Sequence, residues 1–173
     1  MPIALSITRW TNCGNRMRPS RQIDGNASSS VWKVKVYRDY SKMEDLQRFL
    51  TAQDGKRGNY TLYELALKEI QEGKLGFECW IRYVYPQLKR SGTSQLTEFY
   101  GLNGREEAKA YIEHPILRER LIKAAQVLLE IDKPIFEIFS NLGVMKLRTC
   151  MLLFASISDE PVFKQVLRKY GWK

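Results

Sequence analysis

Five side chains in this sequence of 173 residues have the types and the order that a nucleotide-like ligand requires. Trp80, Tyr83 and Gln87 lie on or just after one short segment, and Lys146 and Arg148 follow about sixty residues later. An aromatic ring can stack on a base, an amide can bind a base edge, and the forked guanidinium of arginine suits phosphate oxygens. This set predicts a pocket for a phosphorylated nucleotide derivative.

A purely structural interpretation stays open for each of these positions. Trp80 and the neighbouring Tyr85 are of types that more often fill a helical core. Lys146 and Arg148 precede an apolar run, where such cations often pair with acidic side chains or cap a neighbouring helix. The sequence leaves both interpretations to be tested.

Two residues are weak candidates for acid–base chemistry. Glu78 lies beside the aromatic segment, and His114 is the only imidazole in the chain. A histidine titrates near neutral pH. His114 also precedes Pro115, a residue favoured at the first position of a helix, so we expect His114 to cap that helix. Whether the protein is an enzyme is left undecided.

The cysteines favour neither a metal centre nor a disulfide framework. Cys13, Cys79 and Cys150 lie far apart and are odd in number, and a single histidine is too few for an ordinary zinc site. We therefore expect no metal and no cofactor. Lys74 and Arg82 would stabilise a thiolate at Cys79, but a buried, unreactive thiol is favoured.

The composition is that of one globular domain. Hydrophobic residues make up 44% of the chain and charged residues 27%. The most apolar stretch, residues 145–157, contains Lys146 and Arg148 and is too short to span a bilayer. These features predict a soluble intracellular protein, most simply cytoplasmic, without a membrane partner. They do not predict its oligomeric state.

The net charge of +9 is concentrated in an N-terminal extension. Residues 1–42 hold eight Lys/Arg against two Asp, whereas residues 43–173 hold twenty Lys/Arg against seventeen Asp/Glu. Three interpretations remain: a solvated extension, an organelle transit peptide, or an arm that binds nucleic acid. Within this extension, residues 31–37 alternate Trp32, Val34 and Val36 with other side chains and predict one β-strand.

From residue 43 onward, apolar spacing predicts helices. The predicted fold is mainly α, a single compact bundle-like domain of about seven helices over residues 43–173. Residues with helical spacing or helix-boundary signals lie in the ranges 46–50, 62–70, 77–85, 105–111, 115–129, 135–139, 145–157 and 162–170.

A family resemblance rests on many ordered matches. They are Leu46-Gln47-Arg48-Phe49, Ala52-Gln53, Tyr63, Ala66-Leu67, Ile70, Gly73, Trp80, Tyr83-Val84-Tyr85-Pro86-Gln87-Leu88, Ser94, Tyr100-Gly101, Glu107-Ala108, Ala110-Tyr111, His114-Pro115, Leu117, Arg120-Leu121, Phe139, Lys146-Leu147-Arg148 and Phe154. With them, residues 44–170 resemble the helical domain-of-unknown-function family eighteen-ten. Its bacterial members are often labelled calpastatin, a label that these residues do not support. The resemblance implies a mainly helical fold and no established reaction.

The chain departs from the family pattern at one motif. The family usually has His-Trp-x-Trp where this sequence has Cys79-Trp80-Ile81-Arg82, so a histidine and an aromatic residue are replaced by a thiol and a cation. A role of that histidine cannot be transferred. Arg82 instead adds a cation to the candidate ligand-binding set.

Three classes of function remain, each with its own structural mark. The first is binding or processing of a phosphorylated nucleotide derivative of the ADP-ribose or NAD type, suggested also by a weak, fold-level similarity to the NADAR group. The second is a nucleic-acid accessory protein that uses residues 1–42, and the third is a non-catalytic interaction module. They predict a cationic–aromatic cleft, a continuous basic face and a broad exposed apolar patch, respectively.

Residues 1–30 are expected to contribute little to the stability of the domain, because they offer few apolar side chains to offset the entropy of ordering them. Deleting them should leave the melting temperature within a few degrees of that of the full chain, as measured by circular dichroism. A large decrease would show that this segment is a structural element.

Overall fold

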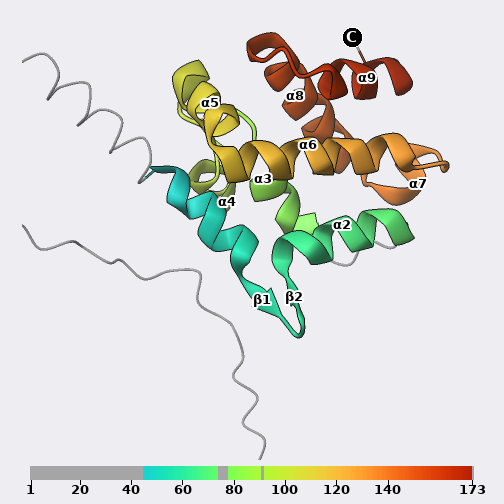
Figure 1. Cartoon of the computed structure of the whole chain (residues 1–173), viewed down its shortest axis with the longest axis horizontal. Helices are drawn as coiled ribbons and strands as arrows, with labels where there is room; N and C mark the ends of the chain where they lie inside the picture. Colours follow the sequence, from blue (N-terminus) through green and yellow to red (C-terminus); the bar gives the residue numbers. More distant parts are fainter. Residues whose placement is uncertain (1–44, 74–77, 91, 173) are drawn as a thin grey trace, which may run out of the picture.

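The computed structural model describes residues 45–73, 78–90 and 92–172 (Figure 1). The predicted strand at residues 31–37 and the extension that contains it lie outside these ranges. The mainly α class is confirmed, because the described strands are limited to one short antiparallel hairpin.

The elements follow the chain in a simple order. They are a helix over residues 45–54, β1 (Lys56–Arg57), β2 (Tyr60–Thr61), α2 (Leu62–Glu72), the 3-10 helix η1 (Glu78–Trp80), α3 (Ile81–Val84), α4 (Gln95–Phe99), α5 (Gly104–Glu113), α6 (Pro115–Glu130), α7 (Ile135–Ile138), α8 (Asn141–Ile157) and α9 (Pro161–Lys169). The hairpin and α4 are the two described elements that the sequence patterns did not predict.

Local sequence signals set several helix ends. Thr61 and Glu64 form a capping box at the start of α2, and Gly73 ends that helix at a positive φ of 63°. Pro115 opens α6 at the first helical turn. The Ser140 hydroxyl accepts the Gly143 N–H at the start of α8. Helix boundaries here follow from side-chain chemistry that was visible in the sequence.

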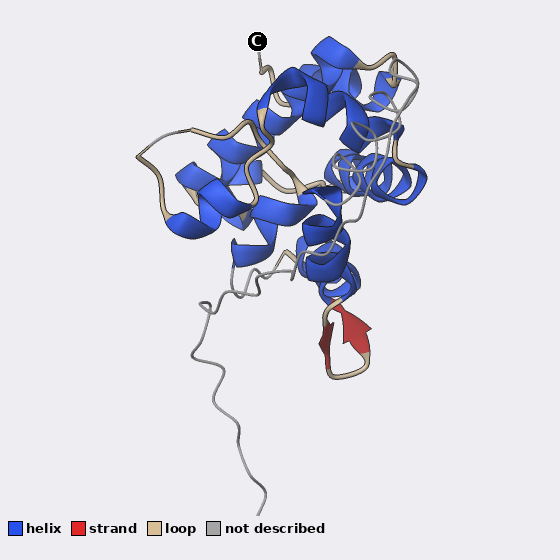
Figure 2. Cartoon of the chain, turned by 90° about the vertical axis from the view of Figure 1, so that its left-hand side faces the viewer, coloured by secondary structure: helices blue, strands red, loops and turns tan. Residues whose placement is uncertain are grey.

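Helix α6 crosses the middle of the domain. It packs against α2 on one side, against α9 on the other and against α5 near its start, while α8 packs against both α9 and α5 (Figure 1). The hairpin β1–β2 projects from this body, as the view in Figure 2 shows. The helices therefore enclose one core, and the hairpin does not cover it.

Apolar side chains from nearly every helix meet in that core. The sequence predicts one common core that contains Trp80, Leu121, Leu128, Leu147 and Phe154, and all five are buried in the same cluster. The prediction of a common core is confirmed. Among the described residues, no helix combines the length and apolar character needed to cross a membrane.

Replacing Leu128 with Ala should lower the free energy of unfolding by about 2–5 kcal/mol, because it removes a fully buried side chain and leaves a cavity. Urea unfolding followed by circular dichroism measures the change. The matched control is Gln126→Ala on an exposed position of the same helix, expected within about 0.5 kcal/mol of wild type. Equal effects of the two substitutions would contradict the packing described above.

Candidate functional site

Arg82 on α3, Gln87 shortly after α3 and Lys146 on α8 line one small cleft, although Lys146 is distant from the other two in sequence. The cleft has a volume of about 20 Å³, which is room for about one water-sized group. Its lining residues are Arg82, Tyr85, Gln87, Leu88, Thr97, Tyr100, Gly101 and Lys146. Two cationic side chains, an amide and two aromatic residues thus surround a space of atomic size.

Arg82 is held in place from the side of α4. Its Nε donates to the Thr97 hydroxyl at 3.2 Å, and that hydroxyl lies 2.9 Å from the hydroxyl of Ser94, the N-cap of α4. Among the described residues Arg82 forms no ion pair, so its terminal nitrogens retain hydrogen-bonding capacity. The guanidinium is oriented by one bond and keeps donors for a ligand.

A parallel β-bridge positions Gln87. The Leu102 N–H donates to the Gln87 carbonyl at 2.8 Å, and the Lys89 N–H donates to the Leu102 carbonyl at 2.8 Å. The two segments approach closely at Gly101, where an added Cβ would lie 2.7 Å from the Lys89 Cα. Only glycine permits this spacing of the two backbones. Gly101 therefore sets the position of the wall that carries Gln87.

Tyr85 and Tyr100 form the aromatic part of the cleft. The Tyr85 ring is fully buried, and its hydroxyl donates to the Ala124 carbonyl at 2.9 Å. Burial raises the pKa of Tyr85 well above its usual range, so this hydroxyl stays protonated as a donor. The Tyr100 ring centroid lies 5.3 Å from that of Tyr83 and 6.0 Å from that of Phe49. Both tyrosines are fixed by the core behind them.

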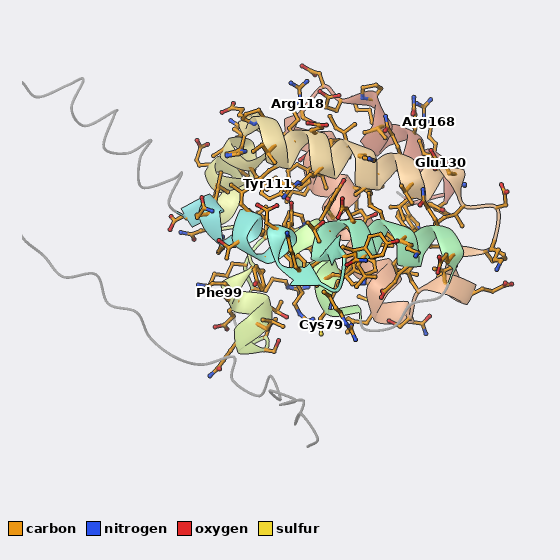
Figure 3. The ribbon with its side chains drawn as sticks, turned by 60° about the horizontal axis from the view of Figure 1, so that its bottom comes forward. Cys79, Phe99, Tyr111, Arg118, Glu130 and Arg168 are labelled. Carbon is orange, nitrogen blue, oxygen red and sulfur yellow. The ribbon has the colours of Figure 1, made fainter. Side chains whose placement is uncertain are left out.

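A larger apolar groove along α4 adjoins this cleft. Its volume is about 590 Å³, and it is lined by Ser94, Gln95, Leu96, Phe99 and Tyr100. Tyr100 borders both the groove and the cleft. Phe99 is 57% exposed and lies on α4 at the edge of the body (Figure 3). An aromatic surface thus lies beside the cationic cleft.

Trp80 and Tyr83 belong to the core and do not line the cleft. The Trp80 indole N–H donates to Glu69 Oε2 at 2.9 Å, and its ring meets Phe139 edge-on at 6.2 Å. Tyr83 is buried as well, and burial raises the pKa of its hydroxyl above the usual range. Trp80 is therefore packed in the core, as its structural interpretation predicted. Ligand binding by these two residues stays a prediction.

Lys146 and Arg148 are placed differently. Both lie on α8, but residues two apart on a helix point to different sides of it. Lys146 lines the cleft, whereas Arg148 is exposed and is not among the lining residues. The anchoring role that the sequence predicts for Arg148 therefore stays a prediction, separate from the cleft.

His114, one of the two acid–base candidates, lies outside the cleft lining. His114 is the N-cap of α6, and its Nδ1 accepts the Leu117 N–H at 3.4 Å, so the predicted capping role is confirmed. Glu78 opens η1, but its side chain is outside the described part of the structure, and its role stays a prediction. Cys79 is exposed, so the expectation of a buried thiol is wrong. On η1, Trp80 takes the buried position next to it.

The sequence patterns assign no role to Gln53, although its hydrogen bonds hold α3, the helix that carries Arg82. This side chain is only 1% exposed. Its Nε2 donates to the Tyr83 carbonyl at 2.8 Å and to the Tyr111 hydroxyl at 3.3 Å, and its Oε1 accepts from Arg120 at 3.1 Å. One signal in the sequence could have predicted its burial. Gln53 follows Phe49 by four residues, so it lies on the same apolar face of the helix.

A largely buried ion pair was also missed. Arg48 Nη2 lies 2.7 Å from Glu107 Oε1 and donates to the Gly101 carbonyl at 3.1 Å. The pair joins the first helix to α5 and to the residue that shapes the cleft wall. Its two members are about sixty residues apart in sequence, so no local pattern links them.

Comparison with family models identifies the family of this chain. The family model described as Protein of unknown function (DUF1810) matches residues 43–172. Among solved structures, the chain is similar to the conserved hypothetical protein Rv1873 from Mycobacterium tuberculosis, with 35% sequence identity and a TM-score of 0.65; the match covers 73% of this chain and 87% of that one. Curated proteins provide no match. The resemblance predicted from the ordered residues is confirmed.

Gly101→Ala should push the segment at Lys89 away and lower the free energy of unfolding by about 1–3 kcal/mol, a typical cost of overpacking. Chemical denaturation measures the cost, and amide exchange should accelerate at Lys89 and Leu102, whose N–H groups form the bridge. Gly55→Ala is the control, because its added Cβ would meet the Leu62 side chain at 3.1 Å and the Ala52 carbonyl oxygen at 3.2 Å, both longer than the 2.7 Å contact at Gly101. Unchanged exchange at the bridge in Gly101→Ala would contradict the close approach described here.

Proposed function

Because the chain belongs to the family described as Protein of unknown function (DUF1810), which brings no reaction with it, we propose its function from the site: it binds a phosphorylated nucleotide derivative of the ADP-ribose or NAD type. In this proposal a phosphate oxygen enters the cleft between Arg82 and Lys146, and the base lies in the groove along α4. The observation that carries the proposal is the convergence of Arg82, Gln87 and Lys146 on one cleft.

The cleft suits the anionic end of such a ligand. Its volume of about 20 Å³ matches a single phosphate oxygen, so the rest of the ligand stays outside it. Hydrogen bonds from a guanidinium or an ammonium to an anion are stronger than those between neutral groups, and Arg82 and Lys146 carry these two groups. The Gln87 amide offers a further donor. A neutral ligand would form no charge-assisted pair with Arg82, which forms no ion pair among the described residues.

The groove suits the aromatic end. A base stacked on exposed Phe99 would remain continuous with a phosphate in the cleft, because Tyr100 borders both spaces. This arrangement replaces Trp80 by Phe99 as the proposed stacking surface. Since His114 does not line the cleft, the proposal is limited to binding.

Thermal-shift measurements on the full chain with ADP-ribose, NAD, ATP and inorganic phosphate test this function. A ligand at 100 times its Kd should stabilise the protein by about 2.7 kcal/mol. Lys146→Gln should weaken the binding of that ligand about tenfold or more, because it removes a charge-assisted hydrogen bond. Isothermal titration calorimetry measures the affinity.

Two further variants make the outcome specific. Lys123→Gln removes an exposed charge on α6, away from the cleft, and should leave affinity unchanged. Arg148→Gln separately tests the anchoring role predicted from the sequence. Failure of all four compounds to stabilise the wild type, or equal losses in Lys123→Gln and Lys146→Gln, would contradict the proposal.

A further inference from the structure

Helix α8 has a second apolar side that faces away from the core. Leu147, Cys150 and Phe154 are fully buried on one side of the helix. On the opposite side, Leu142, Met145, Thr149, Leu152 and Ser156 follow one another at the spacing of a single stripe, and all five are exposed. We call these five residues the α8 stripe. Helix α8 also carries Lys146 and the exposed Arg148, so its apolar residues lie on two sides of the helix and not all round it.

The two hydroxyls in the stripe do not make it polar. Thr149 donates to the Met145 carbonyl at 2.8 Å, and Ser156 donates to the Leu153 carbonyl at 2.7 Å. Both hydroxyl donors are thus satisfied within the helix itself. Leu142 is 60% exposed and Met145 63% exposed, so the remaining surface of the stripe is mostly hydrocarbon. An exposed face of this kind marks a surface for interaction.

We propose that the α8 stripe is the docking surface for residues 31–37 of the same chain. This segment alternates Trp32, Val34 and Val36 with residues that include two lysines, so an extended conformation would present three apolar side chains on one side. A lone strand of this kind has no partner within its own extension. The proposal pairs the exposed α8 stripe with an apolar segment of the same chain.

The dimensions of the two partners agree. Seven residues in an extended conformation span about 23 Å. The α8 stripe runs from Leu142 to Ser156, a rise of about 21 Å along the helix axis. The segment can therefore cover the stripe along its whole length, with Lys33 and Lys35 on the side that faces water.

Two contacts connect the start of the described chain to one end of the stripe through α5. Arg48, three residues after Asp45, pairs with Glu107 on α5 at 2.7 Å. Two residues earlier on α5, Arg105 donates to the carbonyl of Ser156 at 3.2 Å. Residues 38–44 would bridge up to about 23–25 Å from there. A tether of this length keeps the segment at a high effective concentration over the stripe.

Hydrogen exchange measured by mass spectrometry on the full chain tests the docking. Peptides covering residues 31–37 should exchange at least tenfold more slowly than those covering residues 1–30. Met145→Glu should abolish this difference, while exchange in α6 stays unchanged and reports an intact fold. Phe99→Glu is the matched control, because it charges an exposed aromatic residue on α4, and it should leave the protection of residues 31–37 in place.

Three results would overturn the proposal. The first is exchange of residues 31–37 in the wild type at the rate of an unstructured peptide. The second is loss of their protection in Phe99→Glu but not in Met145→Glu, which would place the segment on the α4 groove. The third is a dimer in sedimentation that Met145→Glu converts to a monomer, which would assign the stripe to a second copy of the chain.

Discussion

The arrangement of the domain depends on one buried amide. Gln53 is almost fully enclosed, and an unsatisfied polar group in that position would cost about 1–3 kcal/mol. Its hydrogen bonds reach the backbone of α3 at Tyr83, the hydroxyl of Tyr111 on α5 and the guanidinium of Arg120 on α6. The hydrogen bonds that satisfy the Gln53 amide therefore fix α3 against the longer helices α5 and α6. Arg82 is the residue before Tyr83, so the placement of the cationic cleft follows from the same contacts.

A second constraint acts on the opposite wall of the cleft. Arg48 contacts both the Glu107 carboxylate and the Gly101 carbonyl, and Gly101 lies against the backbone of Lys89. Breaking a buried pair of this kind by removing one partner is strongly destabilising, because the other charge is left uncompensated. The cleft is thus bounded by two polar connections that both start on the first helix. This rigidity suits recognition of a small charged group.

Local patterns predicted most of the fold and part of the candidate site. Helical spacing, Pro115 and Gly73 placed the long helices, and the ordered family residues included Gln87 and Lys146. The hairpin was missed because each of its strands has two residues, too few for an alternation to show. Helix α4 was missed because it is short and buries none of its side chains. Three features depend on how the helices pack, which a single segment of sequence does not reveal. They are the role of Phe99, the exposure of Cys79 and the different directions of Lys146 and Arg148.

The wide sequence separation of the Gln53 contacts bears on the order in which the domain folds. Helices α5 and α6 adjoin in sequence and pack together, as do α8 and α9, so these pairs close short loops. Gln53, by contrast, meets Tyr111 across a separation of 58 residues. Closing a longer loop costs more chain entropy before any contact compensates for it. The first helix is therefore expected to dock late, onto helix pairs that have already formed, and the cleft, whose two walls both depend on that helix, is completed only with this last step.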